Sequence, residues 1–267
     1  KLILSGILVT QTDKLILSGI LPLADYGYFT LAVLVAGGIT IVTGPVSTAL
    51  LPRLARLYAE GSHDDVRRLY NLAAQLVSVI AGSLAVTLVV CSESLLFAWT
   101  GSREVTEATA PILQLYAIGN GLLALGAFPF YLQYARGNLR YHLIGNVVLV
   151  VALTPTLIVA AMKAGAIGAG WVWVVMNLLY LGVWVGYVHS KLEPGLHWNW
   201  LASNVLAIQV PTLLVGVLLG MFRSDLQSRV VELLHAGAIG AACILVATLA
   251  SPLVRRAILE VGRLGAR

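Results

Sequence analysis

Asp13 and Lys14 are the only charged residues between Leu2 and Ala24, a stretch long enough to cross a bilayer as one helix. A carboxylate and an ammonium near the middle of such a helix each cost at least ~2.5 kcal/mol on insertion scales. Such groups are tolerated where they face a bundle interior or a water-filled cavity, and there they mark substrate or ion pathways. This pair therefore predicts a polar cavity that binds an ion or a charged substrate.

A helical wheel places Asp13 and Lys14 on one side with Thr10, Gln11 and Ser18, within an arc of roughly 160°. One side of this helix is therefore polar and requires a polar environment. We interpret Gln11, Asp13 and Lys14 as the wall of a central transport cavity. The alternative is that Asp13 and Lys14 form a salt bridge of neighbouring residues, buried against another helix.

Four further polar residues lie inside apolar runs and are candidates for the same cavity. They are Asn120, Gln133, Tyr134 and Asn146. The competing interpretation of each is a hydrogen bond between helices, which contributes ~0.6 kcal/mol on average in a membrane protein.

The composition indicates a membrane protein, with 59% hydrophobic and 11% charged residues where soluble domains carry ~25% charged residues. The net charge of +5 does not predict nucleic-acid binding, because the basic residues form short clusters between apolar runs. Cys91 and Cys243 lie in apolar segments and are expected to be buried thiols, with no disulfide. The five histidines are spread over the edges of the apolar runs, so we expect no metal, no other cofactor and no enzymatic site.

Beyond the first segment, seven runs without Asp, Glu, Lys or Arg each exceed the ~18 residues that predict a transmembrane helix. They are Tyr26–Pro52, Leu69–Ser92, Ala108–Ala135, Tyr141–Met162, Ala164–Ser190, Pro194–Phe222 and Leu233–Val254. The sequence therefore predicts an all-α integral membrane protein with eight transmembrane helices. Barrel strands are excluded, because the runs are too long and do not alternate.

The connections carry recognisable turn signals. Arg53–Arg68, the longest connection, is predicted to extend the second helix to about Gly61, and Ser62 with Asp65 has the pattern of a capping box. We expect this segment to lie at the membrane surface. Glycines from Gly165 onward predict a tight turn between the fifth and sixth helices, and Pro194-Gly195 predicts the loop that follows the sixth.

Basic residues are distributed unequally between the two sides that eight crossings would create. Twelve of the 17 Lys and Arg residues fall at the chain ends and after helices two, four and six. The positive-inside rule then predicts that both termini are cytoplasmic.

The residues QTDKLILSGILPLADYGYFTLA, followed by PVSTALLPRLARLYAEGSHDDVRRLY, resemble the start of the second half of polysaccharide and O-antigen flippases. These belong to the multidrug/oligosaccharidyl-lipid/polysaccharide exporter superfamily. The resemblance is close over Gln11–Thr100 and looser through Tyr134-Ala135-Arg136-Gly137-Asn138 and Gly165–Gly170. It implies that residues 1–190 form the six-helix second lobe of a two-lobed transporter, and that 191–267 add two C-terminal helices.

The resemblance further implies alternating-access translocation of undecaprenyl-diphosphate-linked oligosaccharide across the bacterial inner membrane, without covalent chemistry. The expected partners are lipid-linked oligosaccharide, membrane lipid, and an N-terminal lobe or polysaccharide assembly proteins. Gln11, Asp13 and Lys14 are the residues to which the family's cavity role transfers.

Three other functions fit parts of the same pattern. A cation-coupled drug antiporter of the same superfamily would be distinguished by a carboxylate cluster in the first lobe. A membrane glycosyltransferase or polymerase would need a longer loop than Arg53–Arg68 to carry acid and base residues. A membrane scaffold that transports nothing would be separated only by binding or transport measurements.

Overall fold

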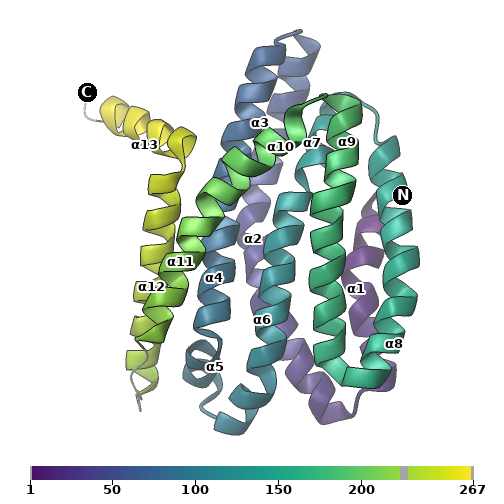
Figure 1. Cartoon of the computed structure of the whole chain (residues 1–267), viewed down its shortest axis with the longest axis vertical. Helices are drawn as coiled ribbons and strands as arrows, with labels where there is room; N and C mark the ends of the chain where they lie inside the picture. Colours follow the sequence, from purple (N-terminus) through teal and green to yellow (C-terminus); the bar gives the residue numbers. More distant parts are fainter. Residues whose placement is uncertain (1, 223–227, 266–267) are drawn as a thin grey trace.

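The computed structural model describes residues 2–222 and 228–265, with side chains described for 11–222 and 228–260. Its described elements are α-helices and three short π-helical segments, arranged side by side (Figure 1). In chain order they are α1 (Leu2–Ile20), α2 (Leu23–Ala59), α3 (His63–Val77), η1 (Ser78–Gly82), α4 (Ser83–Val90), α5 (Ser92–Thr100), α6 (Arg103–Gly126), α7 (Phe128–Ala135), α8 (Arg140–Leu179), η2 (Tyr180–Trp184), α9 (Val185–Leu192), α10 (Leu196–Trp200), η3 (Leu201–Leu206), α11 (Ala207–Met221), α12 (Arg229–Ala250) and α13 (Pro252–Gly265).

Six helical stretches within the described residues are long and apolar enough to cross a membrane. They are Leu23–Ala59, His63–Val90, Arg103–Ala135, Arg140–Leu192, Leu196–Met221 and Arg229–Ala250. Helices satisfy every backbone hydrogen bond within one segment, which is what a hydrocarbon environment requires. The prediction of an all-helical fold is therefore confirmed for the described residues, and the six stretches are consistent with a multi-pass membrane protein.

The longest of these stretches, Arg140–Leu192, reverses direction at a corner. Ala164 and Gly165 have non-helical backbone angles, and Gly165 has φ +57° and ψ −143°, a conformation that is essentially restricted to glycine. Figure 1 shows two antiparallel arms that meet at this corner. The arms pack closely, because the Trp184 indole occupies the space beside Gly145 where a Cβ would clash. The turn predicted at Gly165 is confirmed.

The connection between α2 and α3 follows its predicted course, with one exception. Helix α2 ends at Ala59, and Gly61 has φ +73°. Ser62 occupies the N-cap of α3, but its side chain accepts no hydrogen bond there. The predicted start of the helix is correct, but the predicted capping box is wrong, because its side-chain hydrogen bond from Ser62 does not form. Gly195, with φ +82°, confirms the predicted turn before α10.

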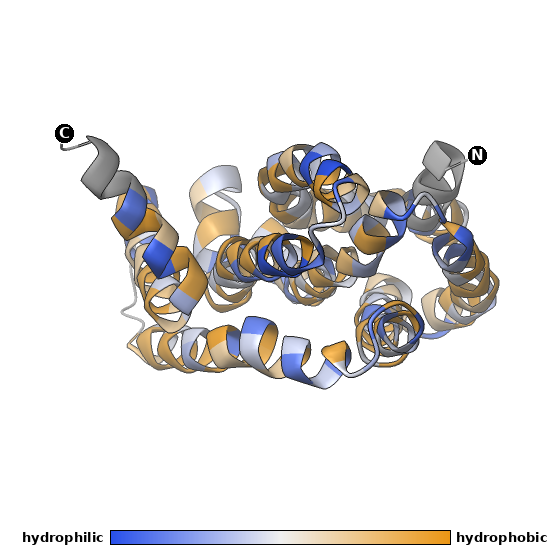
Figure 2. Ribbon diagram, turned by 90° about the horizontal axis from the view of Figure 1, so that it is seen from above, coloured by the Kyte–Doolittle hydropathy of each residue, from blue (hydrophilic) through white to orange (hydrophobic). Residues whose placement is uncertain are grey.

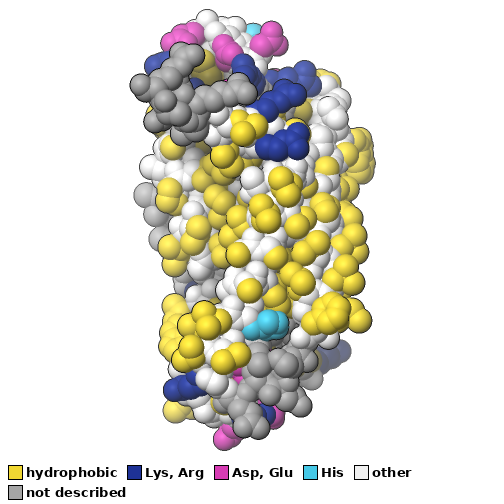
Figure 3. Space-filling model, turned by 90° about the vertical axis from the view of Figure 1, so that its left-hand side faces the viewer, with side chains coloured by type: hydrophobic (Ala, Val, Ile, Leu, Met, Phe, Trp, Pro, Cys, Tyr) yellow, Lys and Arg dark blue, Asp and Glu magenta, His cyan; other side chains and the backbone are white. Residues whose placement is uncertain are grey.

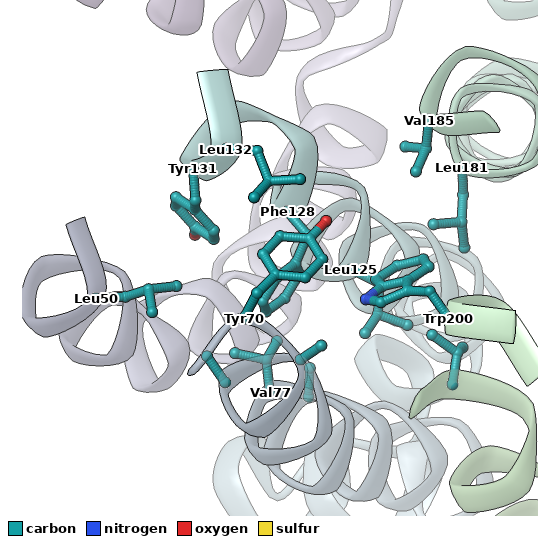
Figure 4. Packing of buried hydrophobic residues seen from close by; sticks show 14 of the residues in the cluster. Leu50, Tyr70, Val77, Leu125, Phe128, Tyr131, Leu132, Leu181, Val185 and Trp200 are labelled. Atoms are coloured by element: carbon teal, nitrogen blue, oxygen red, sulfur yellow. The ribbon is translucent and has the colours of Figure 1, made fainter. Parts of the chain in front are cut away.

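Of the four buried clusters among the described residues, the two largest hold most of the bundle together. The first lies where α2, α3, α7, α9 and α10 converge, around Tyr70, Phe128 and Trp200 (Figure 4). The Tyr70 and Phe128 rings meet edge to face with centroids 5.5 Å apart, a favoured aromatic geometry. The second cluster joins α1, α2, α6 and α8 around Phe29, Tyr116 and Trp173. Tyr116 and Trp173 of this second cluster line the site described below.

Helices α11 and α12 cover α4 on the side of the molecule away from α1 (Figure 1). Glycines make this approach possible, since a Cβ at Gly216 or Gly220 would collide with Val86 or Val90. Their outer surface carries apolar side chains over its middle, with charged side chains gathered toward both ends (Figure 3). Viewed from above, apolar positions recur around the outside of the bundle (Figure 2). This distribution suits a protein surrounded by lipid.

Candidate functional site

A cavity of about 810 Å³ opens between α1, α2, α6 and α8. Gln11, Asp13 and Lys14 line it from α1, and Asn120 lines it from α6. The remaining lining residues are Thr30, Leu31, Val33, Leu34, Gly37, Thr40, Ile41, Tyr116, Leu123 and Trp173. Four of the seven predicted site residues therefore share one cavity, although Asn120 is far from the other three in sequence.

The Asp13 carboxylate is only 5% exposed and accepts hydrogen bonds from two directions. The Tyr116 hydroxyl donates to Oδ2 at 3.1 Å, and the Lys14 backbone N–H donates to Oδ1 at 2.7 Å. The Lys14 ammonium donates to Oε1 of Gln11 at 2.8 Å. Among the described residues the ion pairs are Arg56–Glu60 and Arg136–Glu193, so Asp13 and Lys14 do not form the salt bridge that we considered as an alternative.

Two stacked aromatic rings and the amide of Asn120 form the part of the cavity wall that α6 and α8 supply. Tyr116 and Trp173 stack with ring centroids 6.1 Å apart, and Trp173 Nε1 donates to Oδ1 of Asn120 at 3.0 Å. Gly119 makes this arrangement possible, because a Cβ there would strike the Trp173 indole. Gly170 does the same for Leu115 on the facing helix. Small residues thus bring α6 and α8 close enough for Trp173 to reach the cavity.

The chemistry available in the cavity is recognition by charge and hydrogen bonds. A lysine ammonium can donate three hydrogen bonds, and the bond to Gln11 uses one of them. Amide and hydroxyl groups of Asn120, Thr30 and Thr40 are spaced along walls that are otherwise apolar. Such a site suits a ligand that combines an anionic group with hydroxyls, or a cation held by the Asp13 carboxylate.

A second cavity, of about 370 Å³, continues along α2 and holds Asn146. Thr40 and Leu123 line both cavities, so the two adjoin. Its polar lining includes Ser47 and Tyr131, whose hydroxyls are hydrogen bonded to each other, and His142, whose ring is bonded to the Asn146 amide. Asn146 is therefore close to the site but lies beyond the cavity of Asp13.

Gln133 and Tyr134 line neither of these two cavities. Gln133 is 1% exposed, donates to the Pro129 carbonyl at 3.3 Å and accepts from the His142 backbone N–H at 2.8 Å. Its amide therefore joins the end of α7 to the start of α8. Tyr134 is 45% exposed and packs beside Phe130. Nothing in these contacts supports a cavity role for either residue.

Sequence reasoning missed a histidine pair in the first buried cluster. Nε2 of His189 lies 2.7 Å from the Tyr70 hydroxyl, and its Nδ1 lies 3.3 Å from Nδ1 of His197. The view that the histidines are all scattered is therefore wrong. The pair forms because the Gly195 turn folds α10 back onto α9, and the ring of His197 lies against Gly186. No periodicity in the sequence indicates this contact.

A buried polar network at the junction with the C-terminal helices was also missed. Gln75 donates to Oδ1 of Asn204 at 3.0 Å, and Asn204 donates to Asn71 at 2.9 Å. Oε1 of Gln75 accepts from the Ser251 hydroxyl at 2.7 Å and from the Leu253 backbone N–H at 3.0 Å. These partners are more than a hundred residues apart in the chain, and hydropathy alone carries no information on such pairs.

Comparison of the chain with models of known protein families and with curated proteins gives no match.

Proposed function

We propose that this chain is one lobe of an alternating-access transporter that moves undecaprenyl-diphosphate-linked oligosaccharide across the bacterial inner membrane. The observation that carries the proposal is the convergence of Gln11, Asp13, Lys14 and Asn120 on one cavity of about 810 Å³ between membrane-length helices. The resemblance of Gln11–Thr100 to the second half of polysaccharide flippases supports the same assignment.

In this proposal Lys14 is the anchor for the diphosphate, because it directs an ammonium into the cavity without an ion-pair partner from Asp13. The amides of Gln11 and Asn120 meet sugar hydroxyls, and the isoprenoid tail stays in the bilayer. A facing lobe closes the other side of the cavity, either an N-terminal lobe or another assembly protein. The reaction is a relocation of the substrate, so no covalent step and no cofactor is involved.

The proposed topology has eight crossings. Six stretches are long enough to cross, and one of them, Arg140–Leu192, counts as two crossings because it is divided at Gly165. Helix α1 supplies the eighth crossing. The positive-inside rule then places both termini in the cytoplasm. Ser62 and Ser102 lie at opposite ends of the bundle, at the starts of α3 and α6 (Figure 1). In intact cells, an impermeant thiol reagent should label Ser102→Cys and not Ser62→Cys, and labelling of Ser62→Cys would reverse the orientation.

A cation-coupled antiporter is the second candidate, and one observation favours it. The Asp13 carboxylate is buried and receives the Tyr116 hydroxyl, while Lys14 hydrogen bonds elsewhere. That carboxylate is therefore available to a cation or a proton. The two candidates differ in which of the two charged residues the ligand needs.

The test is binding of undecaprenyl diphosphate to the full chain in lipid nanodiscs. Lys14→Gln should weaken binding about 10- to 100-fold, since a hydrogen bond to a charged group contributes ~1.5–3 kcal/mol. Lys191→Gln is the matched control, because this lysine contacts Tyr187 outside the cavity, and its affinity should equal that of the unchanged protein. Equal affinity for the Lys14→Gln variant would exclude the proposed anchor. Binding lost only in Asp13→Asn would favour the antiporter.

A further inference from the structure

Helix α13 departs from the direction of the membrane-length helices. Helix α12 ends at Ala250, Ser251 has the extended angles φ −100° and ψ 100°, and α13 begins at Pro252. Figure 1 shows α13 leaving the end of α12 at a steep angle and pointing away from the bundle. Helix α12 is long and apolar enough to cross a membrane, and a helix that spans a bilayer ends near the level at which the hydrocarbon region stops. We infer that α13 begins at that boundary.

Buried contacts fix the direction of α13. The side chain of Gln75 accepts from the Ser251 hydroxyl and the Leu253 N–H, and the Ser251 oxygen accepts from the Val254 N–H at 3.4 Å. Val254 is buried in a cluster with Leu72 of α3. These bonds satisfy backbone groups that the start of a helix otherwise leaves without partners. The angle between α12 and α13 is therefore set by the core.

The two faces of α13 differ in character. Apolar residues recur at helical spacing along one face, at Val254, Ala257 and Ile258. The first of them is buried against α3, but Ile258 is 55% exposed, so the apolar face continues beyond the bundle. Arg255 and Arg256 are exposed on the other side, with Leu259 between them on the helical wheel.

We propose that α13 lies in the membrane interface, with Ile258 in the acyl-chain boundary and Arg255 and Arg256 against anionic lipid phosphates. The level at which α12 ends gives the apolar face access to lipid. The two exposed guanidiniums match the negative headgroups, and basic residues near such a surface each add about 1 kcal/mol of attraction. A short helix with an apolar face and a basic face is the form that lies along a bilayer surface. The proposal does not depend on the transport function.

The test uses the full chain, one copy per nanodisc, with a fluorophore on Ile258→Cys or on Glu260→Cys, about 160° away on the helix. The native cysteines, Cys91 and Cys243, are buried. Lipids with a spin label at the acyl-chain boundary should quench the fluorophore at position 258 several-fold more strongly than the one at 260. Equal quenching at the two positions would overturn the proposal.

The lipid preference is tested in the same discs. Replacing a neutral phosphatidylcholine bilayer by one containing phosphatidylglycerol should move the fluorophore at position 258 deeper into the bilayer and so increase its quenching. The double substitution Arg255→Gln with Arg256→Gln should abolish that increase. Arg53→Gln with Arg68→Gln removes the same charge from exposed positions elsewhere and should leave the change intact. A response insensitive to both pairs, or protection of position 258 only when two chains share a disc, contradicts the proposal. The second outcome would identify another copy of the chain as the occupant.

Discussion

Two regions of the bundle bury polar side chains among apolar helices, and they differ in whether those side chains face other protein groups or a cavity. Around Gln75 the side chain is 3% exposed and uses both ends of its amide on Asn204, Ser251 and Leu253. Around Asp13 the polar groups border a cavity of about 810 Å³. The first region is closed and saturated with internal partners, while the second leaves donors and acceptors facing open space.

The difference shows why polarity within a membrane helix does not by itself identify a functional residue. Gln75 and Asp13 are both buried and hydrogen bonded, and both interrupt apolar sequence. Only the groups at the cavity can exchange partners with water or substrate, because Gln75 would first have to abandon the contacts that hold α13. We therefore expect substitutions around Gln75 to lower the stability of the fold, and substitutions at the cavity of Asp13 to lower function.

The largest loss of stability is expected for Gln75→Leu. The Leu253 N–H and Oδ1 of Asn204 would lose their partners in a buried site, and each such group costs about 1–3 kcal/mol. We expect roughly 2–4 kcal/mol of destabilisation, measured as unfolding of the full chain in detergent. Gln209→Leu, which removes a single hydrogen bond to the Ser78 carbonyl, should cost less. Equal destabilisation by Gln75→Leu and Gln209→Leu would show that the network around Gln75 contributes no more than one isolated hydrogen bond.

A smaller effect is expected for Trp173→Phe, which removes the donor to Asn120 but retains an aromatic ring. Because Asn120 lines the cavity, water can replace the lost indole N–H, so the expected cost is about 1 kcal/mol. Trp171→Phe, at an exposed position on the same helix, is the control and should be near neutral. A cost as large as that of Gln75→Leu would show that this side of the cavity is closed to water.

The smallest effect on stability, with the largest on function, is expected for Asp13→Asn. The Lys14 ammonium bonds to Gln11, so neutralising Asp13 removes no ion pair and abundance should stay near that of the unchanged protein. Export of polysaccharide, measured in cells that also contain the facing lobe, should be abolished or strongly reduced. A buried ion pair would behave differently, costing ~3–5 kcal/mol when broken. An abundant, fully active Asp13→Asn with Lys14→Gln variant would show that neither charge is needed for transport.

The sequence predicted much of the fold, because hydropathy and glycine positions act locally. Apolar runs located the membrane-length helices, and Gly61, Gly165 and Gly195 marked turns that need a positive φ. Interruptions of the helices were harder to foresee. The run ending at Ser92 breaks at Cys91 and continues as the short helix α5, and the run ending at Val254 turns at Ser251. No Gly or Pro marks the first break, at Cys91, whereas the second follows from Pro252, because a proline disfavours helical angles in the residue before it.

The site was predicted in part, for a physical reason that its residues illustrate. Asp13 and Lys14 stand out because isolated charges are costly in an apolar helix. Asn120 and Gln133 looked alike in sequence, yet one reaches the cavity and the other joins α7 to α8. Their roles depend on which neighbour each amide meets. Tyr116 was missed because its part in the site comes from a partner 103 residues away.

The corner at Gly165 also bears on how the protein is made. A stretch of 53 residues from Arg140 to Leu192 offers the insertion machinery far more apolar length than one crossing needs. With the corner formed, the arms can enter the lipid together as a hairpin, each shielding part of the other. In the proposed topology of eight crossings, loss of the corner would merge two crossings into one and reverse the orientation of every helix after Leu192. The orientation of the C-terminal helices in that topology thus depends on the turn at Gly165.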